Sequence, residues 1–358
     1  MKKFFVASLV LSILAYPSVT SAQRTLFLDR SAMDTTVKPG DDFFEYANGT
    51  WLKNTKIPDE FSSWGSFTMV YDENTKKLHT LLDSLSNKSH AQGSLEQKAG
   101  DFYKSAMDTV TINKLSYTPL KPMLQKIDAL KNYKELLDLL AQAYKQGDGD
   151  LLGFHVGSDE KNSTRNIAIF NQSGTSLPEK GYYTRQDSNA VLLRKKLVDL
   201  VTSYFSLTGT DAATASKWGQ DILKLETKLA ASHRTPVELR DPSSNYNKFA
   251  TADADKLAPN LGWSHLFSIM GIPADSFNIS QPQYFKTLSA LLASEPIAVW
   301  KEKVKFDYID SKASFLSSAF RNARFDFNKQ ITGQKKRQER WKEGRSAGKK
   351  YRAGAMRI

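Results

Sequence analysis

Residues 39–71 read PGDDFFEYANGTWLKNTKIPDEFSSWGSFTMVY, and no other stretch of the 358 residues combines so many aromatic side chains with so many turn signals. Asp41 and Asp42 stand where the N-cap of a helix belongs. The aromatic residues that follow are spaced at i, i+3 and i+4, which predicts one short helix with an apolar face, and Asn48-Gly49 predicts its left-handed end. The residues of this face are Phe43, Phe44, Tyr46 and Ala47.

The chain beyond this helix remains aromatic but becomes extended. Trp51 continues the apolar surface, and Pro58 keeps Ile57 out of the helical region. The chain therefore runs in a fixed direction toward Trp64 and Phe67, and such a segment needs a large partner surface. An aromatic corner that anchors the N-terminus to a core would explain the same residues, so physical chemistry alone leaves their role open.

The order of residues in this stretch also carries a family resemblance. The pattern D-D-F-F-x-Y-x-N-G-x-W-L-x-x-x-x-I-P, followed by W-G-S-F, resembles the opening of the neprilysin-like zinc metallopeptidases, the group that includes bacterial PepO and the endothelin-converting enzymes. Four more motifs follow in order: VGSDEKNS at 156–163, SLPEKGYYT at 176–184, RDPSSNYNK at 240–248 and GQKKRQERWK at 333–342. The fingerprint residues, which we expect to be structural, are Asp42, Phe43, Phe44, Tyr46, Asn48, Gly49, Trp51, Pro58, Trp64, Gly65 and Phe67.

The resemblance covers residues 35–342 and implies both a fold and an activity. The family is a mostly helical, two-lobed shell around a thermolysin-like zinc site, which cleaves peptides inside a closed cavity. For this chain the resemblance implies a mainly α fold, namely the helical N-terminal lobe of a bacterial-type member. We expect one small β-hairpin in it, and we expect the catalytic thermolysin-like lobe to be mostly missing.

Residues 1–22 have the composition of a secretory signal. Two lysines form the charged end, residues 4–16 form the apolar run, and Thr20-Ser21-Ala22 forms a small-residue cleavage site before Gln23. The apolar run is too short for a stable membrane anchor, and no cysteine follows it that could carry a lipid. The signal predicts an exported protein, periplasmic or extracellular. Because the chain has no cysteine, we expect no disulfide framework, which suits a bacterial periplasm.

The formal net charge of +12 raises the question of a nucleic-acid or membrane-surface partner. Lys2 and Lys3 contribute two of these charges and residues 331–358 a net of eight, which leaves a net of two for the rest of the chain. A near-neutral body with a basic tail is unlike a groove that follows phosphates, so we expect no nucleic-acid partner. The expected partners are peptide substrates, provided that a C-terminal lobe completes the enzyme.

From residue 72 the apolar spacing predicts a helical peptidase N-terminal domain that extends to residue 342. It follows the signal at 1–22 and a strap with the short aromatic helix at 23–71, and it precedes an atypical basic tail at 343–358. The stripes that we expect to form the core are Leu78, Leu81, Leu82 and Leu85; Leu136, Leu137, Leu139 and Leu140; Leu193, Leu197, Leu200, Val201 and Tyr204; Trp218, Ile222, Leu225 and Leu229; Tyr284, Leu288, Leu291 and Leu292; and Val299, Trp300, Val304 and Phe306.

One region interrupts the helical pattern. Within residues 151–172, two apolar runs with β-branched side chains flank a polar turn at 158–163, which predicts a β-hairpin with a long loop. In that turn Asp159, Lys161 and Asn162 match the loop motif of the family. A solvated turn held by Asx hydrogen bonds would explain the same three residues, so both interpretations remain.

A zinc peptidase of this kind needs two histidines one helical turn apart, with a glutamate beside the first. The histidines here are followed by Thr, Ala, Val, Arg and Leu respectively, so none begins an H-E-x-x-H motif; they are His79, His90, His155, His233 and His265. A G-x-S-x-G elbow, a cysteine nucleophile and a phosphate-binding glycine loop are also absent from the sequence. We therefore assign no catalytic residue, no metal ligand and no cofactor to this chain, zinc being the cofactor of the full-length family.

Two departures from the family pattern bear on function. The resemblance fails directly after Trp341-Lys342, which suggests a frameshift or a premature stop before the zinc motif. Some members place arginines near the W-G-S-F element to hold a substrate carboxylate, and the corresponding positions here are Ser63 and Tyr71. Recognition of a terminal carboxylate is therefore in doubt.

Three functions compete on this evidence. We favour the N-terminal domain of a secreted zinc metalloendopeptidase, truncated before the zinc motif and inactive alone. The alternatives are half of a split peptidase that a separate C-terminal chain completes, and a non-catalytic periplasmic binding protein. A downstream H-E-x-x-H frame with its own start site would favour the split peptidase, one without a start the truncated enzyme, and no such frame the binding protein.

Overall fold

The computed structural model describes residues 29–145, 151–273 and 275–342. The expected signal at 1–22 and the basic tail at 343–358 therefore lie outside the described residues. The chain divides into two compact units, residues 1–58 and residues 59–358.

The first unit contains the 3-10 helix η1 (Arg30–Ala32) and the helix α1 (Phe43–Asn54). Asp42 caps α1 as expected, because its side chain accepts a hydrogen bond from the Glu45 amide at 2.9 Å. The expected end at Asn48-Gly49 is wrong, since α1 continues to Asn54. Gly49 is buried inside the helix, where a Cβ atom would lie 2.7 Å from Cβ of Asp34, so this glycine permits a close approach rather than a turn.

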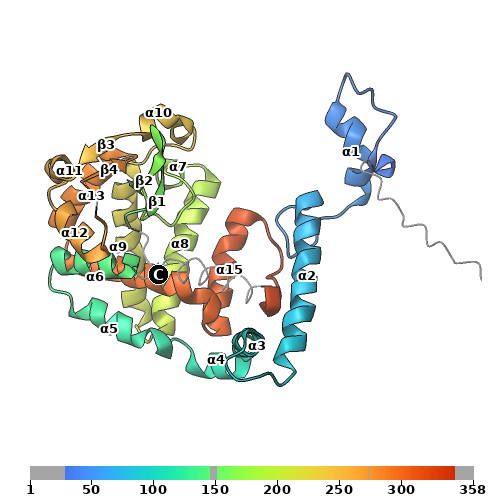
Figure 1. The fold of residues 1–358 in the computed structure, drawn as a ribbon, viewed down its shortest axis with the longest axis horizontal. Helices are drawn as coiled ribbons and strands as arrows, with labels where there is room; N and C mark the ends of the chain where they lie inside the picture. The colour runs from blue at the N-terminus through green and yellow to red at the C-terminus, as the bar shows by residue number, and fades with distance from the viewer. Residues whose placement is uncertain (1–28, 146–150, 274, 343–358) are drawn as a thin grey trace, which may run out of the picture. The chain divides into compact units, whose positions relative to one another are not determined.

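The second unit begins with a pair of contacting helices, α2 (Ser66–Ser86) and α3 (Leu95–Met107). The remaining helical elements, labelled where space allows in Figure 1, are α4 (Thr109–Leu115), η2 (Thr118–Leu120), α5 (Lys121–Ala129), α6 (Tyr133–Lys145), α7 (Gly181–Thr184), α8 (Ser188–Leu207), α9 (Ala212–Ala231), η3 (Glu238–Arg240), α10 (Pro242–Asn245), α11 (Thr251–Leu257), α12 (Trp263–Met270), α13 (Pro282–Ser294), α14 (Ile297–Lys312), η4 (Ala313–Phe315) and α15 (Ser318–Thr332). This confirms the mainly α fold. Among the described residues, no helix is both long enough and apolar enough to cross a membrane.

The expected β-hairpin is confirmed by β1 (Phe154–Asp159) and β2 (Asn162–Phe170), which pair antiparallel. The expected long loop is wrong, because only Glu160 and Lys161 separate the two strands. It belongs to a four-stranded sheet of order β1-β2-β4-β3, in which β2 and β4 are parallel. The strands β3 (Lys248–Ala250) and β4 (Ser276–Ile279) were not expected. They have three and four residues, which is too short for a period-two pattern to be distinguished from a loop.

The hydrophobic core of the second unit consists of two clusters. The first surrounds the sheet, where Phe170 lies edge-to-face against Trp263, Phe277 and Phe285. The second is formed mainly by α8, α9, α14 and α15. α9 and α14 contribute side chains to both clusters and so lie between them.

The expected core stripes have different outcomes in different helices. All five stripe residues of α8 are buried, as are the three of α9 that follow Trp218. The expectation is wrong for α2, because Leu78 and Leu81 are exposed and Leu82 and Leu85 are only half-buried. The apolar spacing in α2 therefore marks a face that is largely exposed among the described residues of the second unit.

Candidate functional site

The fingerprint residues are distributed over both units. In the first unit Asp42 is an exposed cap, Phe43 and Phe44 are exposed, Tyr46, Asn48, Trp51 and Pro58 are half-buried, and Gly49 is buried. In the second unit Trp64 is half-buried against the ring of Phe61, with 4.8 Å between ring centroids. Gly65 precedes the first residue of α2 in extended backbone, and Phe67 is exposed on that helix. Asp42 thus has a capping role and Trp64 an aromatic contact, whereas Phe43, Phe44 and Phe67 are exposed.

The described residues of this chain do not fit a zinc site. No group of three or more His, Cys, Asp or Glu side chains that could hold a metal ion occurs in the described part of the chain. Each histidine has a separate polar neighbour: His79 contacts Tyr103 Oη, His90 the Leu85 carbonyl, His155 the Asn171 amide, His233 the Ser173 carbonyl and His265 the Asp138 carboxylate. We derive no chemical step through zinc from these residues.

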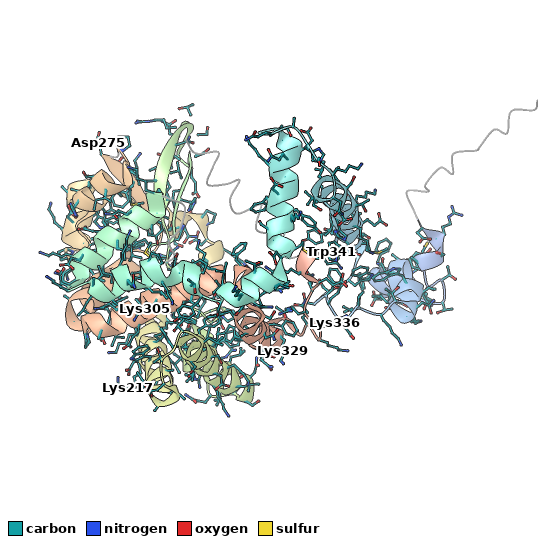
Figure 2. All side chains as sticks on the ribbon, turned by 90° about the horizontal axis from the view of Figure 1, so that it is seen from below. Lys217, Asp275, Lys305, Lys329, Lys336 and Trp341 are labelled. Atoms are coloured by element: carbon teal, nitrogen blue, oxygen red, sulfur yellow. The ribbon has the colours of Figure 1, made fainter. Side chains whose placement is uncertain are left out.

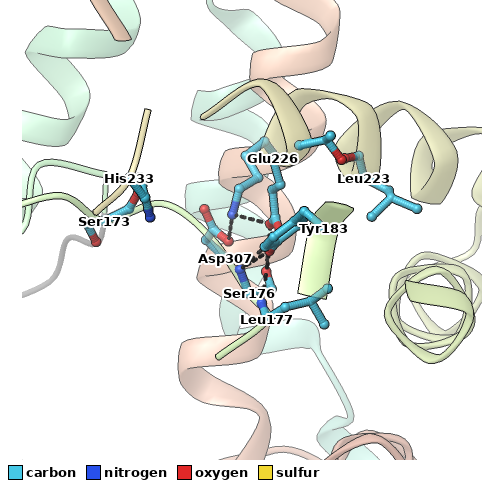
Figure 3. A network of polar contacts seen from close by, with 10 residues as sticks. Ser173, Ser176, Leu177, Tyr183, Leu223, Glu226, His233 and Asp307 are labelled. Atoms are coloured by element: carbon cyan, nitrogen blue, oxygen red, sulfur yellow. Dashed lines mark hydrogen bonds and ion pairs between the residues drawn. The ribbon is translucent and has the colours of Figure 1, made fainter. Parts of the chain in front are cut away.

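A network of buried charges lies where the two core clusters meet (Figure 3). Lys303 of α14 is within 2.9 Å of Glu226 of α9 and within 2.5 Å of Asp307, one helical turn further along α14. The other carboxylate contacts of Glu226 come from the SLPEKGYYT motif: the Tyr183 hydroxyl donates at 2.5 Å, the Ser176 hydroxyl at 2.6 Å and the Ser176 amide at 2.9 Å. The network therefore holds this motif against α9 and α14.

The protonation states in this network follow from burial and charge. Burial raises the pKa of Tyr183 well above its usual value, and the neighbouring Glu226 carboxylate adds to that effect, so the phenol remains a hydrogen-bond donor. Burial alone would lower the pKa of Lys303, but the carboxylates of Asp307 and Glu226 raise it above the usual lysine value. Lys303 is therefore a permanently charged partner of Glu226 rather than a proton donor poised for catalysis.

Sequence reasoning missed Glu226 and Lys303, although a signal for both was present. Glu226 lies four residues after Ile222 and three before Leu229, on the apolar stripe of α9. Lys303 lies three residues after Trp300 and is flanked by Val304 on α14. A charged residue inside an apolar stripe predicts a buried partner of opposite charge, but it does not say which element provides that partner.

A second network connects the hairpin turn to the RDPSSNYNK motif. Asp159 is buried and accepts hydrogen bonds from the Tyr246 hydroxyl at 2.8 Å and from Lys248 Nζ and the Lys161 amide at 3.0 Å each. The hydrogen bonds from Tyr246 and Lys248 hold the pKa of Asp159 at about 2. A solvated turn is therefore not sufficient to describe this loop, because its Asx bond to Lys161 exists alongside long-range contacts.

The GQKKRQERWK motif forms a third set of contacts. We call residues 334–342 the clamp. Its Lys335 and Lys336 amides donate to the Asp59 carbonyl, and the side-chain amide of Gln334 donates to the Glu60 carbonyl at 2.6 Å. These bonds fix the segment that leads into α2.

The end of the clamp contacts α2 and α3 directly. Lys342 Nζ lies 2.5 Å from Glu60 Oε1 and 3.0 Å from Asp72 Oδ1 of α2. Trp341, labelled in Figure 2, stacks on His79 of α2 with 4.3 Å between ring centroids and 13° between ring planes. Arg340 Nε donates to the Ala106 carbonyl of α3 at 2.6 Å. The clamp thus orients the α2–α3 pair through polar and stacking contacts.

The motifs that carry the family resemblance are therefore the points where distant segments are joined, and a family model matches across them. The model described as peptidase family M13 matches residues 39–351. The chain belongs to peptidase family M13. The match continues past residue 342, where the sequence resemblance was expected to end.

Curated relatives of this M13 chain include endothelin-converting enzyme 1 of Rattus norvegicus, which is 28% identical over 327 residues, covering 87% of this chain and 42% of the relative. Endothelin-converting enzyme-like 1 of Mus musculus is 27% identical over 329 residues, covering 86% of this chain and 41% of the relative. The chain thus spans less than half the length of these relatives.

The chain also matches about half the length of related solved structures. A Mycobacterium tuberculosis zinc metalloprotease, Zmp1, crystallised with an inhibitor, matches with a TM-score of 0.82 and 29% identity, covering 89% of this chain and 49% of that one. PepO from Lactobacillus rhamnosis matches with a TM-score of 0.77 and 19% identity, covering 88% of this chain and 50% of that one. The described fold is that of the N-terminal, helical region of an M13 peptidase.

Proposed function

We propose that this chain provides the non-catalytic, helical N-terminal region of an exported zinc metalloendopeptidase, and that it neither holds zinc nor hydrolyses peptides by itself. The observation that carries the proposal is the combination of the M13 match over residues 39–351 with the absence of an H-E-x-x-H motif from the 358 residues. A catalytic zinc site requires three protein ligands, an open position for water and an adjacent general base. In this proposal those groups belong to residues outside this sequence.

The arrangement of the second unit favours a structural rather than a catalytic role. Its buried charges are used to join segments, as Lys303 joins α14 to α9 through Glu226, and the pair is fully buried at the centre of the core. A reacting peptide could not reach these groups. The region would instead provide a wall of the cavity in which a complete peptidase encloses its substrate.

Export is part of the same proposal. The charged, apolar and small-residue segments of residues 1–22 support secretion, and the absence of cysteine suits a periplasm. The mature chain would begin at Gln23. Intact-mass measurement of the exported protein tests this, and retention of Met1 in the exported form would contradict it.

Calorimetric zinc titration together with a mixed-peptide digestion, each with and without chelator, tests the catalytic part of the proposal. The purified chain should bind zinc far below one equivalent and should leave the peptides intact. Chelator-sensitive cleavage by the chain alone would contradict the proposal. Cleavage that begins only after a separate C-terminal half is added would support the split-peptidase form of it over the truncated form.

A further inference from the structure

A groove with a volume of about 370 Å³ lies between α8 and α15 in the second unit, and we call it the α8–α15 groove. This volume is at the lower end of the range of about 300–1,000 Å³ that is typical of sites for small molecules. The floor of the groove is apolar, because Leu200 of α8 and Phe327 of α15 line it and are buried. Small side chains, Ser203 and Ala323, leave the space between the helices unfilled.

The two helices run antiparallel along the groove. The ring centroid of Tyr204, near the end of α8, lies 5.7 Å from that of Phe320, near the start of α15. The groove extends back to Lys196 and forward to Gln330, and in parallel helices these two positions would lie about 27 Å apart at 1.5 Å per residue. A position on α8 therefore faces the position on α15 that lies about equally far from the aromatic contact.

Four charged side chains line the groove, and each helix provides one ion pair. Lys196 Nζ lies 3.2 Å from Asp199 on α8, and Lys329 Nζ, of the residue labelled in Figure 2, lies 2.6 Å from Asp326 on α15. The two lysines are eight and nine residues from the aromatic contact and so face each other. The two aspartates are five and six residues from it and do the same. Because like charges repel across the groove, each level favours an added charge of the opposite sign.

We propose that the α8–α15 groove binds a dipeptide with free termini. The carboxylate of the ligand lies between Lys196 and Lys329, its ammonium group lies between Asp199 and Asp326, and its apolar side chains lie on the floor. The lysine and aspartate of each helix are three residues apart, or about 4.5 Å along the axis. The termini of an extended dipeptide are on the order of 6 Å apart, and the flexible lysine side chains cover the difference. The inference does not rest on the proposed function, since it needs neither zinc nor hydrolysis.

The existing ion pairs do not oppose this arrangement. The exposed fractions of the four charged side chains are 35% for Lys196, 48% for Asp199, 64% for Asp326 and 39% for Lys329. Exposed pairs of this kind contribute only about 0–1 kcal/mol, so the charges of a ligand can replace them at little cost. The apolar floor adds a preference for dipeptides with apolar side chains, because their burial removes apolar surface from water.

Isothermal titration calorimetry of the purified chain with leucyl-leucine tests the proposal. Acetyl-leucyl-leucine amide, which lacks both terminal charges, and glycyl-glycine, which lacks apolar side chains, should each bind at least tenfold more weakly. Asp326→Asn and Lys329→Met should each weaken the binding of leucyl-leucine at least tenfold. Lys256→Met is the matched control and should bind as wild type does, because Lys256 forms an exposed i,i+3 pair with Asp253 outside the groove.

A second kind of variant keeps the test independent of charge. Ala323→Leu fills the groove and removes no charged group, so it should also weaken binding at least tenfold. The melting temperatures of all these variants should stay within about 2 °C of wild type, which separates loss of the site from loss of the fold.

Several results would overturn the proposal. The first is the absence of saturable binding of leucyl-leucine up to about 10 mM. Equal binding of the blocked dipeptide would show that the four charges do not recognise the termini. Equal binding by wild type, Asp326→Asn and Ala323→Leu would place the ligand outside the groove. Binding of free leucine as tight as that of leucyl-leucine would overturn the assignment to a dipeptide.

Discussion

The region built on α8, α9, α13 and α14 and the α2–α3 pair differ in what holds them in place, although both are helical. In the first region, large side chains such as Tyr204, Tyr284 and Trp300 are fully buried. The α2–α3 pair is instead held by the clamp, and apolar side chains of α2 such as Phe67 and Leu81 are exposed. The first region has the burial of a self-sufficient core, whereas α2 is fixed mainly by polar and stacking contacts. Apolar residues recur at helical spacing in both regions, so periodicity alone does not distinguish a buried face from an exposed one.

The largest effect that we expect concerns the buried charges of the first region. Lys303→Met leaves the fully buried Glu226 without its cation, which should lower the free energy of unfolding by about 3–5 kcal/mol. Urea denaturation at pH 7 measures this loss. The double variant Lys303→Met/Glu226→Gln should recover most of it, because the glutamine carries no charge. Lys217→Met breaks an ion pair between an exposed lysine and the partly buried Asp221 and should cost less than about 1 kcal/mol. An equal loss of stability for both lysine variants would contradict the distinction between the buried and the surface pair.

A pair of leucine truncations tests the comparison directly. Leu197→Ala in α8 removes a fully buried side chain and should cost about 2–5 kcal/mol. Leu81→Ala in α2 truncates a side chain that is mostly exposed, so the chain alone should lose less than about 0.5 kcal/mol. Thermal and chemical denaturation of the two variants give these values. A loss above about 2 kcal/mol for Leu81→Ala would place α2 inside the core and contradict the comparison.

Glu302 of α14 is expected to make the stability of the first region depend on pH. Its Oε2 atom is buried without a hydrogen-bond partner, and burial, together with the charge of Asp221, raises the pKa of Glu302 to about 7. Because this value lies above that of the unfolded chain, the carboxyl favours folding while it is protonated, and its contribution is lost as pH rises from about 4.5 to about 7. Glu302→Gln should remove this dependence and stabilise the chain at pH 8 by about 1–3 kcal/mol. A pH profile of unfolding stability that is the same for Glu302→Gln and wild type would contradict this role of Glu302.

The clamp is expected to affect stability locally rather than globally. Lys342→Met removes the ion pairs to Glu60 and Asp72 and should cost about 1–2 kcal/mol of local stability. The cost should fall on α2 and α3 alone. Limited proteolysis should therefore cut the variant faster within residues 66–107, while the rest of the second unit resists as in wild type. Uniformly faster cleavage would show that the clamp stabilises the whole unit instead.

The sequence predicted those elements in which the local signals agree with the tertiary environment. The stripe of α8 is buried as expected because every apolar position faces the second core cluster. Asn48-Gly49 does not end the helix, contrary to the prediction. A glycine is needed at position 49 because Asp34, fifteen residues earlier in the sequence, packs directly against it. Local sequence patterns give no information about such a long-range contact.

The candidate site was less accessible to sequence reasoning for the same physical reason. Glu226 and Lys303 are separated by 77 positions, and either one alone resembles a surface charge that has fallen into an apolar stripe. The leucines of α2 have the correct helical period, but whether such a stripe becomes core depends on the surface that faces it. The family resemblance provided the fold, since its motifs are the segments that make these long-range contacts.

Amide hydrogen exchange of the chain tests the central claim, the contrast between the two regions, most directly. Amides of α8, α9 and α13 should exchange only through global unfolding, and amides of α2 should exchange by local opening at a free energy several kcal/mol lower. Protection of α2 equal to that of α8 would contradict the account.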